Sequence, residues 1–312
     1  MCNGVAPFRC IRRHYRLSVT RPLNTQDANV DRRICIHIGT HKTATTSIQG
    51  LMARAERGFA RHGIFIPKAG LNSGDIFGHH NIGWALRGDR RSQPKWGGID
   101  ELCAELGRTR LKRALISSED FEYLVEYPDM LRLIEAKLKA AGWQPEYVLF
   151  LRDPAAYAIS LYHQLYRHGL ADPFPVFVDK VIAEGKVTFE GDWTYYLDYA
   201  TFIAKWRAAT TGPLATYSYD EAKAGPGVLR AFLNVLGLPA DPAILDAPPL
   251  RPHWTKRLRY VLRGRKLPDA PADPTRLNVT PLKVTDEMRV EARRISAAFA
   301  LPRDAMSPIG PG

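Results

Sequence analysis

The chain has 312 residues, of which 45% are hydrophobic and 24% charged, and its formal net charge at pH 7 is +12. These values predict a folded protein with one large domain, and they exclude a fibrous, repetitive or mainly disordered chain. No stretch of the sequence contains the roughly 20 consecutive apolar residues that a membrane-spanning helix needs.

Strand and helix signals alternate along the sequence. Short apolar runs rich in β-branched residues predict strands, and amphipathic stretches that end near glycine predict helices. In chain order they are a strand at 33–38, a helix at 46–61, a strand at 63–67, a short helix at 81–86, a helix at 99–108, a strand at 113–117, a helix at 129–141, a strand at 146–151, helices at 153–168 and 195–209, a strand at 214–219, and helices at 227–236 and 286–300. This alternation predicts an α/β fold, with a central parallel sheet of about five strands flanked by helices.

We expect three parts. Residues 1–32 show no period and are predicted to be a poorly ordered basic leader, residues 33–240 form the α/β domain, and residues 241–312 form a Pro- and Arg-rich extension with a terminal helix. The four cysteines make no CxxC pair and no zinc pattern, which is typical of a reducing compartment. Because the leader lacks the apolar core of a secretory signal, the simplest prediction is a cytoplasmic protein.

The positive charge is concentrated in two segments. Residues 1–33 hold seven arginines and two aspartates, for a net charge of +5, and residues 251–266 hold seven basic residues and no acid, for a net charge of +7. The rest of the chain is therefore formally neutral, which argues against a nucleic-acid binder with a basic folded face. The two basic segments are either solvated or in peripheral contact with an acidic surface.

The strongest local signal lies at residues 33–49, which read RICIHIGTHKTATTSIQ. A loop that leads from the carboxyl end of a parallel strand into a helix presents unpaired N–H groups to an anion. Lys42 adds a positive charge, and Thr45, Thr46 and Ser47 add hydroxyl donors. The pattern is not a Walker A loop, because Lys42 lies three residues before Thr45 and position 44 is Ala. An ordinary βα turn is the alternative to a phosphate-binding loop.

The segment GTHKTATTSIQ resembles the 5′-phosphosulfate loop of sulfotransferases that use PAPS (3′-phosphoadenosine 5′-phosphosulfate), which typically contains Pro-Lys-x-Gly-Thr-Thr or Ser. His41 stands where Pro is usual, and Ala44 where Gly is usual. A second segment, YVLFLRDPAAYAIS, resembles the other signature of the family, a strand that ends in Arg with Ser eight residues later. It gives Arg152 and Ser160 at that spacing, and Arg matches the geometry of phosphate oxygens.

The resemblance, which extends loosely over residues 33–240 and toward bacterial carbohydrate-type members, implies a three-layer fold like that of P-loop NTPases. It implies transfer of the sulfuryl group of PAPS to a hydroxyl or amine acceptor, with 3′,5′-ADP as the product and with a carbohydrate or glycolipid as the favoured acceptor. Arg152 and Ser160 then hold the 3′-phosphate. The 5′-phosphosulfate is held by the loop residues His41, Lys42, Thr43, Ala44, Thr45, Thr46 and Ser47. No clustered carboxylates call for a metal, and we expect none.

In-line transfer also needs a base for the acceptor's proton. Glu119 is the first candidate, since it follows the strand 113–117 at the edge that carries the loop, and the family uses Glu or His in this role. His80, in the segment FGHHNIGW, is the second. Their alternative roles are a helix N-terminal carboxylate or substrate contact for Glu119, and a surface or capping histidine for His80. His163 is expected to pack on its helix.

Other features are less specific. The aromatic side chains of residues 193–206 either stack on a ligand or lie in the core. Arg257 and Arg259 either contact the 3′-phosphate or are solvated. Residues 68–98 and 169–195 are expected to select the acceptor, whose identity the sequence does not give, and it does not give the oligomeric state. Two alternative functions are a P-loop kinase that uses ATP and Mg²⁺, and a nucleotide-binding relative without catalytic activity.

Overall fold

The computed structural model describes residues 32–71, 77–238, 240–247 and 282–309. The predicted leader up to residue 31, the basic segment 251–266 with Arg257 and Arg259, and part of the stretch 68–98 lie outside the described residues. The predicted division into three parts stays a prediction.

Five parallel strands form the central sheet, as the sequence predicts. In chain order they are β1 (Arg32–Ile38), β2 (Ile64–Phe65), β3 (Arg113–Ser118), β4 (Trp143–Leu151) and β7 (Leu214–Ser218). Their order across the sheet is β2-β3-β1-β4-β7, and every neighbouring pair is parallel. Two further strands, β5 (Lys186–Phe189) and β6 (Trp193–Tyr196), form a separate antiparallel pair.

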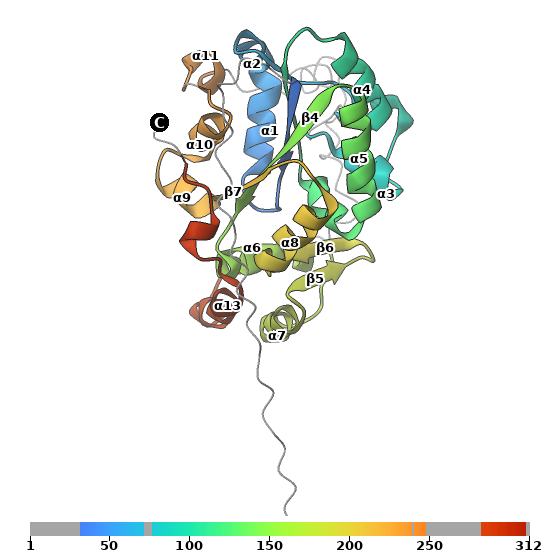
Figure 1. Ribbon diagram of the computed structural model, residues 1–312. Coiled ribbons are helices and arrows are strands. Elements are labelled where there is room, and N and C mark those ends of the chain that lie inside the picture. The colour runs from blue at the N-terminus through green and yellow to red at the C-terminus, as the bar shows by residue number, and fades with distance from the viewer. Residues whose placement is uncertain (1–31, 72–76, 239, 248–281, 310–312) are drawn as a thin grey trace, which may run out of the picture.

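Helices cover both faces of the sheet, which gives three layers (Figure 1). The described helices are α1 (Thr45–Arg54), α2 (Glu56–Arg61), α3 (His80–Arg87), α4 (Ile99–Arg108), α5 (Pro128–Ala140), α6 (Pro154–Arg167), α7 (Phe174–Glu184), α8 (Tyr199–Ala209), α9 (Tyr219–Ala224), α10 (Val228–Val235), α11 (Pro242–Leu245) and α13 (Asp286–Phe299), with short 3-10 helices η1 (Pro94–Trp96), η2 (Glu119–Glu126) and η3 (Arg303–Ala305).

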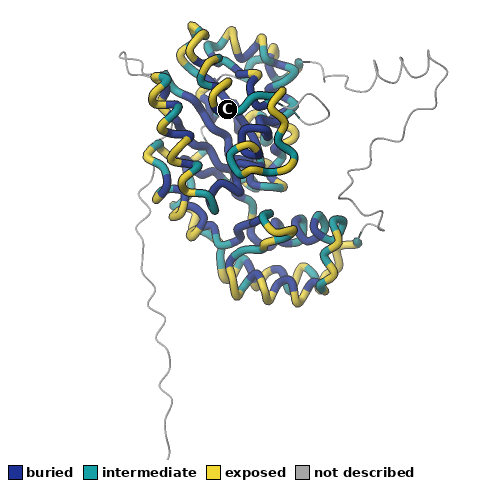
Figure 2. The backbone as a smooth tube through the Cα atoms, turned by 90° about the vertical axis from the view of Figure 1, so that its right-hand side faces the viewer, coloured by how far each residue is buried: buried dark blue, intermediate teal, exposed yellow. Residues whose placement is uncertain are grey.

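The central strands are buried on both faces, which is why they read as continuous apolar runs. On β1, Ile34, Ile36 and Ile38 enter the core shared with α4, α5 and α8, whereas Cys35 points to the opposite face and the core shared with α1 and α10. Figure 2 shows these strands as a dark blue layer enclosed by helices with exposed outer surfaces. The rigid sheet therefore fixes where the loops at its carboxyl edge begin.

The topology places the loop after β1 at the centre of that edge. The chain runs from β1 outward to β2 and β3, and then crosses to β4 on the other side of β1. This reversal is a topological switch point, where open α/β sheets form their ligand crevices. Ile38 pairs with Ser118 of β3 and with Leu149 of β4. The first residues after β1 therefore lie close to Glu119 and to the end of β4.

Two predicted helices differ from the structure, and one helix was not predicted. The helix expected at 46–61 is divided at Ala55, whose φ of −107° interrupts the helical backbone between α1 and α2. The helix expected at 195–209 starts only at Tyr199, because Trp193–Tyr196 is β6. A turn with positive φ at Glu190 and Gly191 joins β5 to β6. The helix α7 was not predicted, because residues 169–195 show no clear period.

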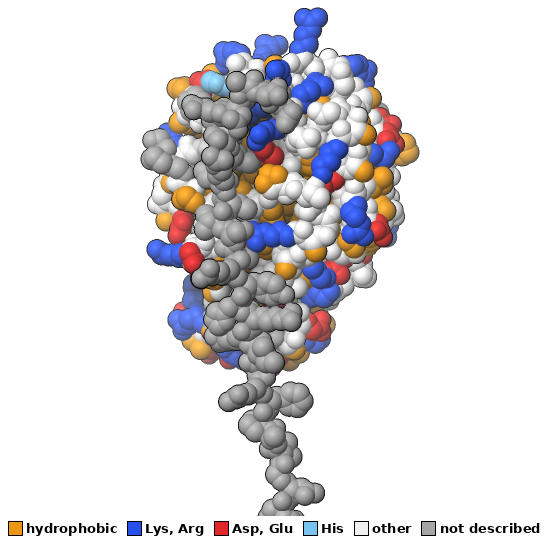
Figure 3. Space-filling model, in the orientation of Figure 1, with side chains coloured by type: hydrophobic (Ala, Val, Ile, Leu, Met, Phe, Trp, Pro, Cys, Tyr) orange, Lys and Arg blue, Asp and Glu red, His pale blue; other side chains and the backbone are white. Residues whose placement is uncertain are grey.

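The C-terminal helix α13 packs against α6 and α7, and it contributes Ala292 and Ile295 to the core that these helices share with the sheet. On the face shown in Figure 3, Lys and Arg side chains are scattered among acidic and hydrophobic ones and do not form a single stripe. No helix in the part of the chain that the structure describes is long and apolar enough to cross a membrane.

Candidate functional site

The loop after β1 is tied to the ends of both neighbouring strands. The N–H of Gly39 donates to the Ser118 carbonyl at 3.2 Å, and the Thr40 hydroxyl donates to the Phe150 carbonyl at 2.7 Å. A Cβ at Gly39 would lie 2.6 Å from Oγ1 and Cγ2 of Thr45, so this position has no room for a side chain. The loop is therefore held in place before any ligand arrives.

Two residues of the loop adopt the left-handed conformation that favours glycine. Lys42 has a φ of 66° and Ala44 a φ of 60°. Ala44 is the N-cap of α1, and no side-chain hydrogen bond caps this helix. The N–H of Ser47 donates to the Ala44 carbonyl, and the buried hydroxyl of Thr43 donates to the Thr40 carbonyl. The start of α1 therefore has N–H groups without a side-chain cap, an arrangement that in general favours anions at a helix N-terminus.

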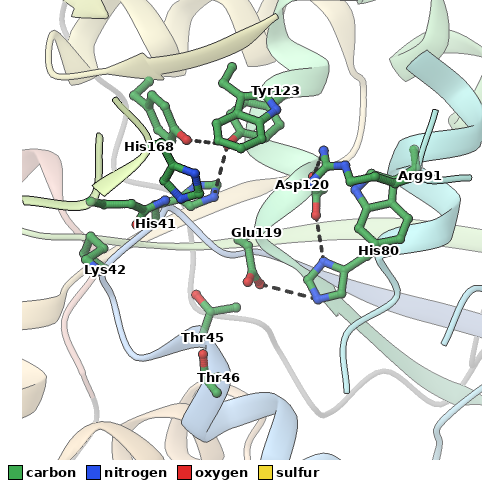
Figure 4. Close-up of a pocket in the computed structure, with 14 residues that line it drawn as sticks. His41, Lys42, Thr45, Thr46, His80, Arg91, Glu119, Asp120, Tyr123 and His168 are labelled. Carbon is green, nitrogen blue, oxygen red and sulfur yellow. Dashed lines mark hydrogen bonds and ion pairs between the residues drawn. The ribbon is translucent and has the colours of Figure 1, made fainter. Parts of the chain in front are cut away.

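A cavity of about 330 Å³ opens beside this loop (Figure 4). The loop and α1, the segment around α3, the start of η2, the C-terminal part of α6 and the β5–β6 hairpin all contribute to its wall. Its lining residues are His41, Lys42, Thr45, Thr46, His80, Trp84, Arg91, Glu119, Asp120, Tyr123, Gln164, His168, Trp193 and Tyr195. The structure thus brings Lys42, Thr45 and Thr46 together with both predicted bases.

Glu119 and His80 lie side by side in the wall of this cavity. Oε2 of Glu119 accepts a hydrogen bond from the amide of Gln49 at 2.8 Å and lies 3.9 Å from Nε2 of His80. The other ring nitrogen of His80, Nδ1, lies 2.8 Å from Oδ2 of Asp120 and 2.9 Å from the Ser118 hydroxyl. Nε2 is buried and has no hydrogen-bond partner among the described residues.

Burial and the neighbouring carboxylates have opposite effects on the pKa of His80. Burial lowers its pKa, but the hydrogen bond to Asp120 and the negative charges of Glu119 and Asp120 outweigh burial, so the net effect raises the pKa of His80. Burial alone would raise the pKa of Asp120. The hydrogen bond from His80 and the positive charges of His80 and Arg91 outweigh burial, and they hold the pKa of Asp120 well below its usual range. His80 is buried at 1% exposure, which excludes a surface histidine.

Asp120 is in turn part of a larger ionic cluster. Its Oδ1 lies 3.2 Å from the guanidinium of Arg91 and 3.6 Å from that of Arg87. Arg91 also binds Asp89 and lies over the rings of Trp84 and Trp193, at 4.7 and 5.6 Å from their centroids. Such charge and ring contacts hold the side chain of Arg91 in the cavity wall.

The neighbouring histidine, His79, has a different role. Its Nε2 donates to the Pro67 carbonyl at 3.1 Å, and its Nδ1 accepts from the Ser117 N–H at 3.2 Å. Burial lowers the pKa of His79 to about 4, so the ring is neutral and both nitrogens are used. No group of His, Cys, Asp or Glu side chains within the described ranges has an arrangement that could hold a metal ion.

A buried carboxylate forms hydrogen bonds with the loop after β1. Oε2 of Glu122, a fully buried residue, accepts from the N–H of His41 at 3.0 Å and lies 2.8 Å from its Nδ1. The hydroxyl of Tyr157 donates to Oε1 of the same carboxylate at 3.3 Å. On the other side of the ring, the Tyr123 hydroxyl lies 3.1 Å from Nε2 of His41. His41 is therefore fixed in the loop by contacts on both ring nitrogens.

Arg152 and Ser160 are not among the residues that line this cavity. Arg152 directly follows β4, and Ser160 lies in α6. Nε of Arg152 is buried and lacks a hydrogen-bond partner among the described residues, and its guanidinium lies 5.7 Å from the ring centroid of Tyr219. Burial lowers the pKa of His163, and the positive charges of Arg167 and Lys42 act in the same direction. The positive charge of Lys42 thus acts on His163 in α6.

Sequence reasoning did not identify Gln49, Asp120, Arg91 and Glu122. Asp120 follows Glu119 directly, and that adjacency was a usable signal. Gln49 falls within the predicted helix 46–61 and Glu122 in a stretch with no predicted element, and only the tertiary contacts reveal their partners. The roles of the predicted site residues themselves stay predictions from sequence and geometry.

Comparisons with known proteins gave matches among solved structures only. No family model and no curated protein matches the chain. A sulfotransferase from Alicyclobacillus acidocaldarius aligns with 15% identity and a TM-score of 0.41, over 76% of this chain and 97% of the other. The sulfotransferase domain of the Synechococcus PCC 7002 olefin synthase aligns with 14% identity and a TM-score of 0.40, over 87% of this chain and 96% of the other. The chain is thus similar in structure, at low identity, to two sulfotransferases.

Proposed function

We propose that this protein transfers the sulfuryl group of PAPS to a hydroxyl or amine acceptor. The observation that carries the proposal is the placement of an uncapped helix start and Lys42 on the wall of one cavity with Glu119 and His80. Anion binding and proton abstraction are the two functions that such a transfer requires.

The residues around the loop fit a donor with phosphate at both ends. Lys42, Thr45 and Thr46 line the cavity and would hold the phosphosulfate, together with N–H groups at the start of α1. Arg152 has a buried Nε without a partner among the described residues, which suits a 3′-phosphate, with Ser160 as a second donor. The other loop residues, His41, Thr43, Ala44 and Ser47, are proposed to shape this cradle.

During transfer, the acceptor oxygen forms a bond to sulfur while the bond between sulfur and the bridging oxygen of the donor breaks. The electron pair of that bond stays with the phosphate of 3′,5′-ADP, where Lys42 offsets the charge. The proton of the acceptor passes to Glu119, the more exposed of the two candidate bases, with His80 as the second candidate. This scheme assigns no step to a metal ion.

We propose a carbohydrate or glycolipid hydroxyl as the acceptor. The cavity wall also carries Trp84, Trp193 and Tyr195, together with the polar side chains of Gln164 and His168. Aromatic rings with adjacent hydrogen-bonding groups suit a sugar ring, which has both apolar faces and polar edges. Regions 68–98 and 169–195 both contribute to this wall, as expected for segments that select an acceptor. The cytoplasmic location stays a prediction from the sequence.

Calorimetric titration with 3′,5′-ADP and with ATP plus Mg²⁺ tests the proposal. We expect metal-independent binding of 3′,5′-ADP, weakened at least about tenfold in Lys42→Ala, which corresponds to the loss of one charge-assisted phosphate contact. Lys223→Ala, an exposed change in α9, is the matched control and should bind normally. Tight ATP–Mg²⁺ binding without 3′,5′-ADP binding would favour the kinase instead, and donor binding with no transfer to any acceptor would favour an inactive relative.

A further inference from the structure

We infer that Gln49 and Asp120 are positioning residues that hold Glu119 for proton abstraction, Gln49 directly and Asp120 through His80. This inference rests on the proposed function and explains why two candidate bases lie together. Glu119 is assigned as the base, and the His80–Asp120 pair as its support.

The exposure of the two side chains separates their roles. The side chain of Glu119 is 22% exposed, whereas that of His80 is 2% exposed. Gly78 lies directly against Nε2 of His80, because a Cβ at position 78 would be only 2.2 Å from that nitrogen. An acceptor in the cavity can therefore reach the carboxylate of Glu119 more easily than the ring nitrogen behind it.

Among the described residues, the contacts of the Glu119 carboxylate fall on one oxygen, Oε2. Gln49 donates to Oε2 at 2.8 Å, and Nε2 of His80 lies 3.9 Å from the same atom. Because Oε2 is held in this way, Oε1 is the atom that we assign to the acceptor's proton. Gln49 lies one turn after Thr45 in α1, so the helix that starts at the phosphate loop also orients the base.

The support behind His80 is rigid and charged. Asp120 fixes Nδ1 at 2.8 Å, and its other oxygen, Oδ1, lies 3.2 Å from Arg91. This leaves Nε2, a buried nitrogen without a hydrogen-bond partner among the described residues, directed toward Oε2 of Glu119 at 3.9 Å (Figure 4). The raised pKa of His80 agrees with a ring that interacts with both carboxylates. Correct placement of a catalytic group within a fraction of an ångström is what such contacts provide.

The test uses ³⁵S-labelled PAPS as the donor and water as the acceptor, so that no acceptor needs to be known. Sulfate release is measured beside the Kd for 3′,5′-ADP and the melting temperature. We expect Gln49→Met and Asp120→Asn each to slow release at least about tenfold while the Kd stays within about twofold. Gln144→Met, an exposed change in β4 far from the loop, is the matched control for the lost amide.

A double variant distinguishes positioning from general stability. Gln49→Met should cause no further loss in a Glu119→Gln background, because a residue that acts only through Glu119 has nothing left to position. A full additional tenfold loss there, or normal release in both single variants, would overturn the inference. If Asp120→Asn does not fold, the Gln49→Met arm decides alone.

Two outcomes for the unmodified protein have separate meanings. Failure to bind 3′,5′-ADP would contradict the proposed function itself. Binding without any sulfate release would overturn the assignment of Glu119 as a base, since its side chain is open to water in this cavity.

Discussion

Ala44 holds a backbone conformation that alanine adopts only at a cost. Its φ of 60° is left-handed, and it is the N-cap from which α1 begins. The family that the sequence resembles usually has glycine here, and the structure shows why, since glycine alone adopts this conformation without a Cβ clash. The loop keeps its shape because Thr40, Thr43 and Thr45 bind it internally and to β4.

Ala44→Gly should therefore stabilise the protein. Glycine removes the strain energy of the left-handed backbone at position 44, and this gain is expected to exceed the cost of the extra conformational entropy that glycine gives the unfolded chain. The net increase in the free energy of unfolding is about 0.5 to 1 kcal/mol. Urea unfolding gives the free energy of unfolding directly. Ala53→Gly in the last turn of α1, where the backbone is helical, is the control and should destabilise by about 0.5 to 1 kcal/mol. A loss of stability in Ala44→Gly would show that the loop is not strained.

Glu122 is one of the residues whose contacts only the fold reveals. A fully buried carboxylate is stable only when its oxygens are hydrogen-bonded, and His41 and Tyr157 satisfy both of them. His41 thus has a structural role in the loop. The His ring and its N–H give the buried carboxylate two partners that proline lacks.

At the scale of elements, the β5–β6 hairpin forms one wall of the cavity and is tied to α3. Trp193 and Tyr195 lie on β6, and Asp192 just before it forms an ion pair with the buried guanidinium of Arg87 at 2.8 Å. The hairpin pairs with no strand of the central sheet. An isolated two-stranded hairpin is marginal by itself, so side contacts of this kind stabilise it.

Asp192→Asn should loosen the hairpin without unfolding the domain. A lost ion pair of this exposure is worth about 1 kcal/mol, so amide exchange in β5 and β6 should become about fivefold faster, while exchange in β1 and β4 is unchanged. Hydrogen-exchange mass spectrometry measures both. Glu190→Gln removes a carboxylate from the same turn and serves as the control, since Glu190 makes no ion pair within the described part of the chain. Equal exchange in the two variants would show that Arg87 does not anchor the hairpin.

At the scale of the whole molecule, stability depends on histidines that are buried and neutral. Burial lowers the pKa of His37 to about 3 and that of His79 to about 4, against an ordinary value of 6.5. Below pH 6.5 the unfolded chain takes up protons that the folded chain excludes, so the free energy of unfolding falls as the pH falls. For His79 the loss extends from pH 6.5 to about pH 4, and for His37 to about pH 3.

Urea unfolding at pH 7 and pH 5 tests this dependence. As the pH falls from 7 to 5, protonation of each of the two histidines in the unfolded chain should lower the free energy of unfolding by about 2 kcal/mol, at roughly 1.4 kcal/mol per pH unit below pH 6.5. In His79→Gln the drop should be smaller by about 2 kcal/mol, whatever the stability of the variant at pH 7. An identical drop in the variant and the unmodified protein would mean that His79 is not neutral in the fold.

The sequence determined the parts of this protein that depend on near neighbours in the chain. The strands of the sheet and most helices follow from local periodicity, which a run of side chains carries by itself. The phosphate-binding role of the loop at residues 39–47 and of the pair Arg152 and Ser160 comes from the resemblance of short motifs and stays a prediction. Tertiary structure decided the contacts between distant residues. Gln49 meets Glu119 and His41 meets Glu122 across 70 and 81 residues, because β1 lies between β3 and β4 and brings their following loops to one edge. The order of strands is set by packing of the whole core, so a candidate base could be proposed from the sequence, whereas its contacts with Gln49 and His80 could not.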